Sequence, residues 1–145
     1  MAESLNPADR SSLSAEQGPV NMSVGGVLVF EGGEGLRHEA VLARLEQRLH
    51  LIPRYRQRIR SVPLELGRPV WVDDPHFDLN YHVRVTALVE PDDAALCALM
   101  GRLMGQELDR RRPLWEVWIV HGLKSLVTGR EFSRDKPTRY AHVVA

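Results

Sequence analysis

The segment Leu114–Val120, LWEVWIV, is apolar on nearly both faces of the strand that it predicts. Side chains alternate between the two faces of a strand, so a strand without a polar face must lie inside a sheet that is covered on both sides. Glu116 is the exception, because a buried carboxylate needs a partner, and an arginine is the most economical one. One face would carry Leu114, Trp118 and Val120, and the other would carry Trp115, Val117 and Ile119.

Two segments nearer the N-terminus predict a strand and a helix. Met22–Phe30, MSVGGVLVF, predicts a buried strand, and its Gly25-Gly26 pair favours a bulge or a close backbone approach. From Leu36 the apolar period changes to that of an amphipathic helix, which Pro53 should end or kink because proline has no amide donor. The apolar stripe of this helix consists of Leu42, Leu45, Leu49 and Ile52.

The rest of the chain completes a mixed pattern. Residues 1–21 are turn-rich, residues 66–78 are extended, and Tyr81–Val89 alternates like a strand with one fairly polar face. Asp93–Arg110 predicts a second helix, which begins after Pro91 with carboxylates at the positive end of the helix dipole. The order strand, helix, extended pair, helix, strand predicts an α/β or α+β layer.

The pattern weakens after Gly122. Residues 124–145, KSLVTGREFSRDKPTRYAHVVA, carry scattered charges and at best one short strand near Leu126-Val127. We therefore divide the chain into one incomplete lobe, residues 1–123, and a divergent, poorly patterned tail, residues 124–145.

Composition narrows the function classes. The 145 residues are 43% hydrophobic, enough for one domain with a packed core, and the net charge of zero gives no field that would attract nucleic acid. No apolar run reaches the roughly 18 residues of a membrane span, and the polar N-terminus has no signal peptide, so a cytoplasmic location is expected. The single cysteine, Cys97, suits a reducing compartment and is expected to be buried.

An acidic cluster precedes the alternating strand. A metal site would need its side chains to converge on one point, whereas Pro75 holds the segment extended and sends neighbouring side chains to opposite faces. Turn formation is the favoured interpretation, and we predict no metal site. The cluster consists of Asp73, Asp74, His76 and Asp78, and His82 follows it.

Four arginines alternate along RYRQRIR. They would share one face if the segment is extended, where they would contact lipid or phosphate, and they would scatter if it is helical. A solvated basic face is favoured, and the contact stays open. The four arginines are Arg54, Arg56, Arg58 and Arg60.

Elsewhere in the sequence, no phosphate-binding loop or nucleophile motif marks a catalytic centre.

Four stretches carry a family resemblance: LNPADRSSLSAEQGPVNMSVGGVLVFEGG, LIPRYRQRIR, PVWVDDPHFDLNYHVR and ELDRRRPLWEVWIVHGL. In this order, from Leu5 to Leu123, they resemble the N-terminal lobe of the bacterial wax ester synthase/diacylglycerol acyltransferase family. The resemblance implies part of a chloramphenicol acetyltransferase-like, CoA-dependent acyltransferase fold with a catalytic tunnel between two lobes. It also implies acyl transfer from acyl-CoA, as co-substrate, to diacylglycerol or a long-chain alcohol, in the cytoplasm or at the periphery of membranes and lipid inclusions.

The resemblance assigns Pro113, Leu114, Trp115 and Glu116 to the family's PLWE stretch beside the active centre, although a structural role is favoured for them. In family members the next strand carries HHxxxDG, whose second histidine is the proposed general base. This sequence has no His-His pair and no Asp-Gly, and Val-Val-Ala follows its last histidine, His142. We therefore expect a truncated, inactive fragment without catalytic residues.

Two alternatives remain. In the first alternative, the chain is a non-catalytic module that binds lipid or a neighbouring protein through the Arg54 to Arg60 segment and through apolar surface left open by a missing lobe. In the second, a separately encoded C-terminal half completes the enzyme.

Overall fold

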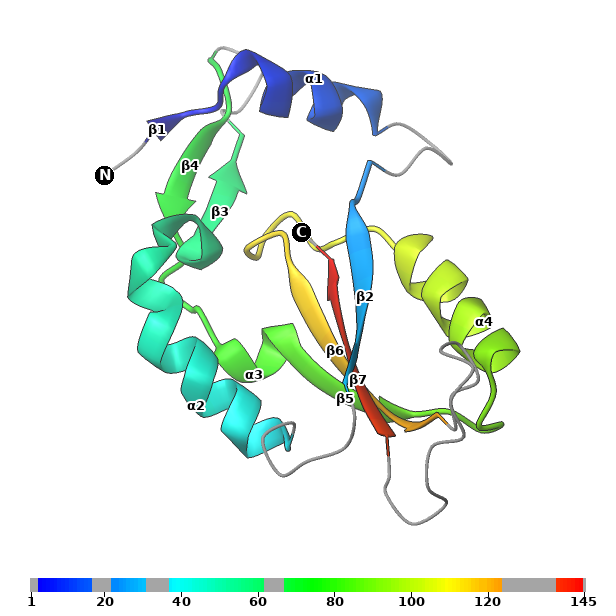
Figure 1. The fold of residues 1–145 in the computed structure, drawn as a ribbon. Helices are drawn as coiled ribbons and strands as arrows, with labels where there is room; N and C mark the ends of the chain where they lie inside the picture. Colours follow the sequence, from blue (N-terminus) through cyan, green and yellow to red (C-terminus); the bar gives the residue numbers. More distant parts are fainter. Residues whose placement is uncertain (1–2, 17–21, 31–36, 62–66, 124–137, 145) are drawn as a thin grey trace.

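The computed structural model describes residues 3–16, 22–30, 37–61, 67–123 and 138–144. Their main feature is a four-stranded sheet in the order β2-β7-β6-β5, and a smaller sheet has the order β1-β4-β3. Figure 1 shows α2 and α3 on one side of the larger sheet and α4 on the other side. The predicted mixed α/β architecture is therefore confirmed.

The larger sheet combines one parallel and two antiparallel pairings. β5 (Val83–Ala87) and β6 (Glu116–Leu123) are parallel because α4 (Asp93–Met104) connects them as a crossover helix. β7 (Thr138–Val144) pairs antiparallel with both β6 and β2 (Gly25–Phe30). This arrangement places β6 inside the sheet, as its two apolar faces predicted.

The two faces of β6 belong to separate cores. The first core lies under α2 (His38–Arg48), whose end continues as the 3₁₀ turns η2 (Leu49–Leu51) and η3 (Pro53–Arg56). The second core lies under α4. The predicted division into two faces is therefore confirmed for Trp115, Val117 and Ile119 and for Trp118 and Val120, whereas Leu114 precedes β6 and lies in neither core. The buried residues are Leu49, Val83, Trp115, Val117 and Ile119 in the first core and Leu99, Leu103, Val120 and Leu123 in the second.

α4 begins where the sequence predicted and ends earlier. The Asp92 side chain accepts a hydrogen bond from the Ala95 amide at 2.7 Å, which satisfies one free donor of the first turn. The helix ends at Met104 instead of Arg110, and the Gly105 amide closes it on the Gly101 carbonyl. Glycine has the weakest helix propensity after proline, so the helix stops well before Pro113.

The N-terminal residues form regular structure that the turn-rich pattern did not predict. β1 (Glu3–Ser4) pairs with β4 (Val70–Asp73), which also pairs with β3 (Gln57–Arg60). α1 (Pro7–Ala15) follows, and the Asn6 side chain caps it by accepting from the Asp9 amide at 2.8 Å. Asn6 as cap with Pro7 in the first turn is a helix-start signal, so the sequence contained the information.

β2 differs from the prediction in two ways. It is an exposed edge strand among the described strands, not a buried one, and Leu28 is 56% exposed. Its pairing with β7 is regular through Gly25 and Gly26 and contains no bulge. The irregularity lies instead between β6 and β7 at Gly122, whose φ of 94° is a conformation that only glycine adopts easily.

The expectation of an unpatterned tail was wrong for Thr138–Val144, which forms β7. β7 lies between β2 and β6, so it supplies the backbone hydrogen bonds that both of these strands need. Its sequence, TRYAHVV, is rich in residues that favour strands. The short strand predicted near Leu126-Val127 lies outside the described residues.

Cys97, which was expected to be buried, is exposed. The helix α4 turns Leu99 and Leu103 toward the sheet and turns Cys97 away from it.

None of the helices in the described part of the chain has the length and hydropathy of a membrane span.

Candidate functional site

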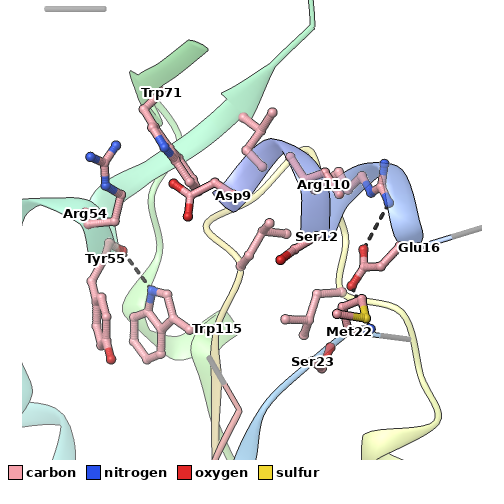
Figure 2. Close-up of a pocket in the computed structure, with 14 residues that line it drawn as sticks. Asp9, Ser12, Glu16, Met22, Ser23, Arg54, Tyr55, Trp71, Arg110 and Trp115 are labelled. Carbon is pink, nitrogen blue, oxygen red and sulfur yellow. Dashed lines mark hydrogen bonds and ion pairs between the residues drawn. The ribbon is translucent and has the colours of Figure 1, made fainter. Parts of the chain in front are cut away.

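A pocket of about 290 Å³ lies between α1, the β3-β4 pair and the chain just before β6. Figure 2 shows its lining, and in Figure 1 α1 reaches from the small sheet toward the start of β2, above the open end of the larger sheet. The size is at the lower end for small-molecule sites, and the walls are mainly apolar. The apolar side chains include Leu13, Ile59, Trp71, Leu108, Leu114 and Trp115.

The PLWE stretch, Pro113 to Glu116, supplies part of this wall. Leu114 and Trp115 line the pocket, Pro113 is buried next to them, and Glu116 is not among the lining residues. The Trp115 indole Nε1 donates to the Tyr55 carbonyl at 2.8 Å, and the two rings stack with centroids 5.0 Å apart. Trp115 is therefore fixed between the pocket and the first core, a structural role that also shapes the pocket.

His82, at the end of α3 (Leu79–His82), supports Trp115 from behind. Its ring is fully buried and stacks on Trp115 with centroids 4.4 Å apart and on Phe77 with centroids 5.3 Å apart. His82 Nδ1 lies 2.8 Å from the Trp115 carbonyl oxygen, which can only accept, so Nδ1 carries the proton. Burial lowers the pKa of His82, and the hydrogen bond to Trp115 opposes this shift.

The sequence interpretation missed His82, which it placed on the polar face of a strand. The α3 turn changes the direction of that residue, and its side chain enters the core. The sequence feature that could have indicated a buried histidine is its aromatic neighbours. Phe77 and Tyr81 both precede His82 in FDLNYH, and both rings contact it.

Glu116 has the arginine partner that the sequence predicted. Arg84 Nη2 lies 3.2 Å from Glu116 Oε1, and the Trp118 indole Nε1 donates to Glu116 Oε2 at 2.9 Å. The Glu116 side chain is 16% exposed, so both oxygens lie close to the protein interior and both have partners. This network is part of the sheet and does not reach the pocket.

α1 closes the pocket and is attached at both ends. Near its start, Glu3 Oε2 lies 3.0 Å from Arg54 Nη2, and at its end Glu16 Oε2 lies 3.0 Å from Arg110 Nη2. The other Glu16 oxygen accepts from the Met22 amide at 3.2 Å. Figure 2 shows the Arg110–Glu16 pair at the rim. Exposed pairs of this kind contribute little stability individually, and the buried Leu5 and the β1-β4 pairing also hold the segment before α1.

The four arginines of RYRQRIR have different surroundings. Arg54 lies over the Trp71 ring at 4.6 Å, Arg56 lies over Phe77 at 5.6 Å, and Arg58 Nε lies 3.9 Å from the buried Asp74. Arg60, at the end of β3, is exposed. The turn at η3 separates the first two from the strand, so one common basic face does not form. A lipid or phosphate contact at these residues stays a prediction.

The acidic cluster forms a turn. Asp74 accepts from the His76 amide at 3.0 Å, and Asp78 caps α3 by accepting from the Asn80 amide at 3.0 Å. Arg112 Nη1 donates to the His76 carbonyl at 2.7 Å and so ties this turn to the segment before β6. Within the described ranges, no group of three His, Cys, Asp or Glu residues could hold a metal ion.

The carboxyl end of β7 lies at the same edge of the sheet as the pocket. Val144 pairs with Glu116 at the start of β6 and with Gly25 at the start of β2, and Met22, Ser23 and Leu114 near these starts line the pocket. The resemblance implies that in family members the strand after the PLWE stretch carries HHxxxDG. In this chain the strand paired with β6 on that side is β7, and its sequence, TRYAHVV, does not contain the motif.

Known proteins have sequences similar to this one. The sequence model of the family "Wax ester synthase/diacylglycerol acyltransferase catalytic domain" matches residues 5–127. The probable diacylglycerol O-acyltransferase tgs3 of Mycobacterium tuberculosis is 45% identical over 126 residues, which are 86% of this chain and 46% of that protein. The probable diacylglycerol O-acyltransferase tgs1 of the same organism is 44% identical over 122 residues, 82% of this chain and 26% of that protein. The chain thus spans about half the length of the first of these relatives and about a quarter of the second.

Solved structures of acyltransferases and condensation domains have a fold similar to that of this chain. The wax ester synthase/diacylglycerol acyltransferase from Marinobacter aquaeolei VT8 superposes with a TM-score of 0.67 at 29% identity, over 96% of this chain and 33% of that chain. A starter condensation domain of rhizomide synthetase RzmA, solved in complex with C8-CoA, gives a TM-score of 0.64 at 19% identity, over 97% of this chain and 30% of that chain, which is a likeness of fold alone. The predicted acyltransferase fold is therefore confirmed, and because the family's sequence model also matches most of its length, this chain belongs to the wax ester synthase/diacylglycerol acyltransferase family.

Proposed function

We propose that this chain is the substrate-binding N-terminal part of an acyl-CoA-dependent O-acyltransferase, which transfers a fatty acyl group to diacylglycerol or to a long-chain alcohol. The observation that carries the proposal is the apolar pocket formed by Leu114 and Trp115, in a chain whose relatives are probable diacylglycerol O-acyltransferases. The pocket lies at the edge of the sheet where β7 ends, so it would hold the hydrocarbon chain of a substrate close to the end of that strand.

The reaction needs a general base. The acceptor hydroxyl oxygen attacks the thioester carbonyl carbon, its proton passes to the base, and the CoA thiolate leaves. His82 does not fit this task, because it is fully buried and its Nδ1 is already bonded to Trp115. The 145 residues contain no HHxxxDG, so we place the base on an HHxxxDG segment that a complementing part of the enzyme would supply, and we expect these residues alone to be inactive.

The test is an acyl-transfer assay with labelled palmitoyl-CoA and either dioleoylglycerol or hexadecanol. The chain alone should form no more product than a protein-free control. Mixed with a separately produced part of a family member that begins at its HHxxxDG strand, it should form triacylglycerol or wax ester. A mixture that stays inactive although the two parts co-elute would contradict the proposal, and turnover by the chain alone would contradict the expected inactivity.

A matched pair of variants connects the activity of that mixture to the pocket. Leu114→Trp fills the pocket with a larger side chain and should abolish product formation. Val89→Trp places the same ring on a position that is 94% exposed and distant in the fold, and it should leave product formation unchanged.

A second candidate function is favoured by one observation, the exposed apolar side chains on the edge strand β2. Such an edge suits a non-catalytic module that pairs with another protein or binds a lipid surface. Co-sedimentation with phosphatidylcholine vesicles, with and without phosphatidylserine at low salt, tests the lipid version. Sedimentation that requires the anionic lipid and is lost in the Arg56→Gln, Arg60→Gln double variant would support it.

A further inference from the structure

We propose that α1 is a movable cover of the pocket, hinged before Pro7 and held closed by Glu16, and that ligands enter when the Glu16 end of the helix lifts. The inference concerns how any ligand reaches the pocket, and it rests on the proposed function only in taking the pocket as a ligand site. At about 290 Å³, the closed pocket lies just below the roughly 300–1,000 Å³ of most ligand sites. A ligand of ordinary size therefore needs one wall to move.

The first argument is how little of α1 is packed. None of its nine residues is buried, and Leu13 is the only large apolar side chain among them. One face of the helix nevertheless lines the pocket, through Asp9, Ser12, Leu13 and the C-cap Glu16, and Figure 2 shows three of them at the rim. A helix with few buried apolar contacts belongs to the part of a fold that opens locally at low cost. α1 can thus leave the pocket while both cores stay folded.

The second argument is the firm attachment of the chain just before α1. Leu5 is 4% exposed, and its amide donates to the Pro69 carbonyl at 3.2 Å. Glu3 and Ser4 pair with β4, so this end is part of the small sheet. The backbone at Asn6, between the buried Leu5 and the helix, is extended and exposed. This residue is where the chain can turn when the helix moves.

The third argument is that one carboxylate holds the other end. Glu16 Oε2 lies 3.0 Å from Arg110 Nη2, and Glu16 Oε1 accepts from the Met22 amide at 3.2 Å. Arg110 precedes β6 and Met22 precedes β2, so Glu16 joins α1 to both segments that lead into the larger sheet. The Glu16 and Arg110 side chains are 21% and 49% exposed, so water and salt compete with these contacts. We call the two contacts of Glu16 the latch.

Hydrogen exchange of the 145-residue chain, followed by mass spectrometry, tests the movement. An isolated helix of nine residues is not stable in water, so the α1 amides exchange whenever the helix leaves the pocket. They should exchange faster than the β6 amides in the wild-type chain. Glu16→Ala removes both contacts of the latch and should speed α1 exchange about fivefold, whereas Arg110→Ala removes the ion pair alone and should speed it about threefold. The amides of the β1-β4 pairing should be unchanged in both variants.

A charge swap separates the latch from a general loss of stability. Glu16→Arg places two cations together and should speed α1 exchange further, and the addition of Arg110→Glu restores an ion pair and should slow it again. The control is Glu90→Ala, at an exposed acidic residue beyond the opposite end of β5, which should leave α1 exchange unchanged. A rise in NaCl from about 50 to 500 mM should speed α1 exchange in the wild-type chain and not in Arg110→Ala.

Stopped-flow mixing with Nile red, a neutral apolar dye, measures ligand entry. The binding phase that Leu114→Trp removes reports on the pocket. In this phase Glu16→Ala should raise the association and dissociation rates together, because ligands enter and leave through the same opening. A variant that only damaged the pocket would raise the dissociation rate alone.

Three results would overturn the inference: unchanged α1 exchange in a folded Glu16→Ala variant, a charge swap that does not slow exchange, or an association rate that does not rise. Circular dichroism checks that each variant is folded. These measurements involve no turnover, so the cover can be established where the acyl-transfer assay fails, and the reverse.

Discussion

The Nδ1 atom of His82 lies 2.8 Å from the backbone carbonyl oxygen of Trp115, and the two rings stack on each other with centroids 4.4 Å apart. Two residues 33 positions apart in the chain are thus joined by one hydrogen bond and one ring contact. The pair holds the wall of the pocket against the first core, so the protonation of one imidazole is linked to the stability of the site.

We predict that the free energy of unfolding falls as the pH drops below 6.5, the ordinary pKa of histidine. Burial lowers the pKa of His82 in the folded chain, so the unfolded chain binds the proton first and is stabilised by it. Above this window both states are neutral, and His82 adds no pH dependence. Nearby Glu116 and Asp74 raise the pKa and Arg112 lowers it, all less than burial does.

Urea denaturation at pH 7.5 and pH 5.5 measures this effect. His82→Asn is the comparison, because the asparagine amide can still donate to the Trp115 carbonyl and does not titrate. The difference in stability between the two pH values should be smaller in this variant than in the wild-type chain. An equal difference in both proteins would assign the pH dependence to the other histidines.

We predict that Glu116→Ala lowers the free energy of unfolding by about 1–3 kcal/mol, because it removes the acceptor of Trp118 Nε1 and the ion-pair partner of Arg84 Nη2, although Arg84 Nε still donates to the Tyr81 carbonyl. Arg84→Ala should cost less, since Arg84 is more exposed. The double variant should cost less than the sum of the two single variants. Glu90→Ala, an exposed acidic position, is the control and should change stability by about 0.5 kcal/mol or less. Additive losses would show that Arg84 and Glu116 are not coupled.

We predict opposite outcomes for two glycines that both lie in strands. Gly122→Ala forces a side chain onto a φ of 94° at the irregular point of the β6-β7 ladder and should cost about 1–2 kcal/mol. Gly26→Ala places a methyl group in open space on an edge strand, so its cost should be near zero. Thermal unfolding of both variants compares them directly. A neutral Gly122→Ala would mean that this turn relaxes freely.

Local patterns predicted the parts of the fold that depend on them. The two faces of β6 follow from strand alternation and from the cost of exposing large apolar side chains. The need of Glu116 for an arginine follows from the cost of a buried charge. That the partner is Arg84 depends on the parallel register of β5 and β6, which pairs Arg84 with Trp118 and which local sequence does not encode.

The missed features depend on tertiary structure. β2 has the composition of a buried strand and is exposed because no described element covers it. His82 fits a strand pattern, and one turn of helix moves it into the core. The pocket joins residues from Asp9 to Trp115, so only the assembled fold brings them together. Trp71 stood in a segment interpreted simply as extended, and the sequence does not show that its buried indole N–H has no acceptor among the described residues.

We finally predict that the chain associates with itself through β2. Among the described strands β2 is an edge, and Leu28 and Val29 on it are 56% and 46% exposed, so it offers backbone groups without a described partner strand and apolar surface to a second strand. Sedimentation velocity over a range of protein concentrations should show a concentration-dependent increase in mass.

Leu28→Lys places a charge on that edge and should shift the distribution to monomer, because a lysine must lose its hydration when two edges pair. Val89→Lys is the matched control: Val89 is 94% exposed but lies outside the strands, so the same charge there should leave the association unchanged. An effect of equal size from both variants would mean that net charge, and not the β2 edge, governs association. If a C-terminal lobe covers β2 in the completed enzyme, adding that lobe should also suppress self-association, which would identify β2 as the surface where the two parts of the enzyme meet.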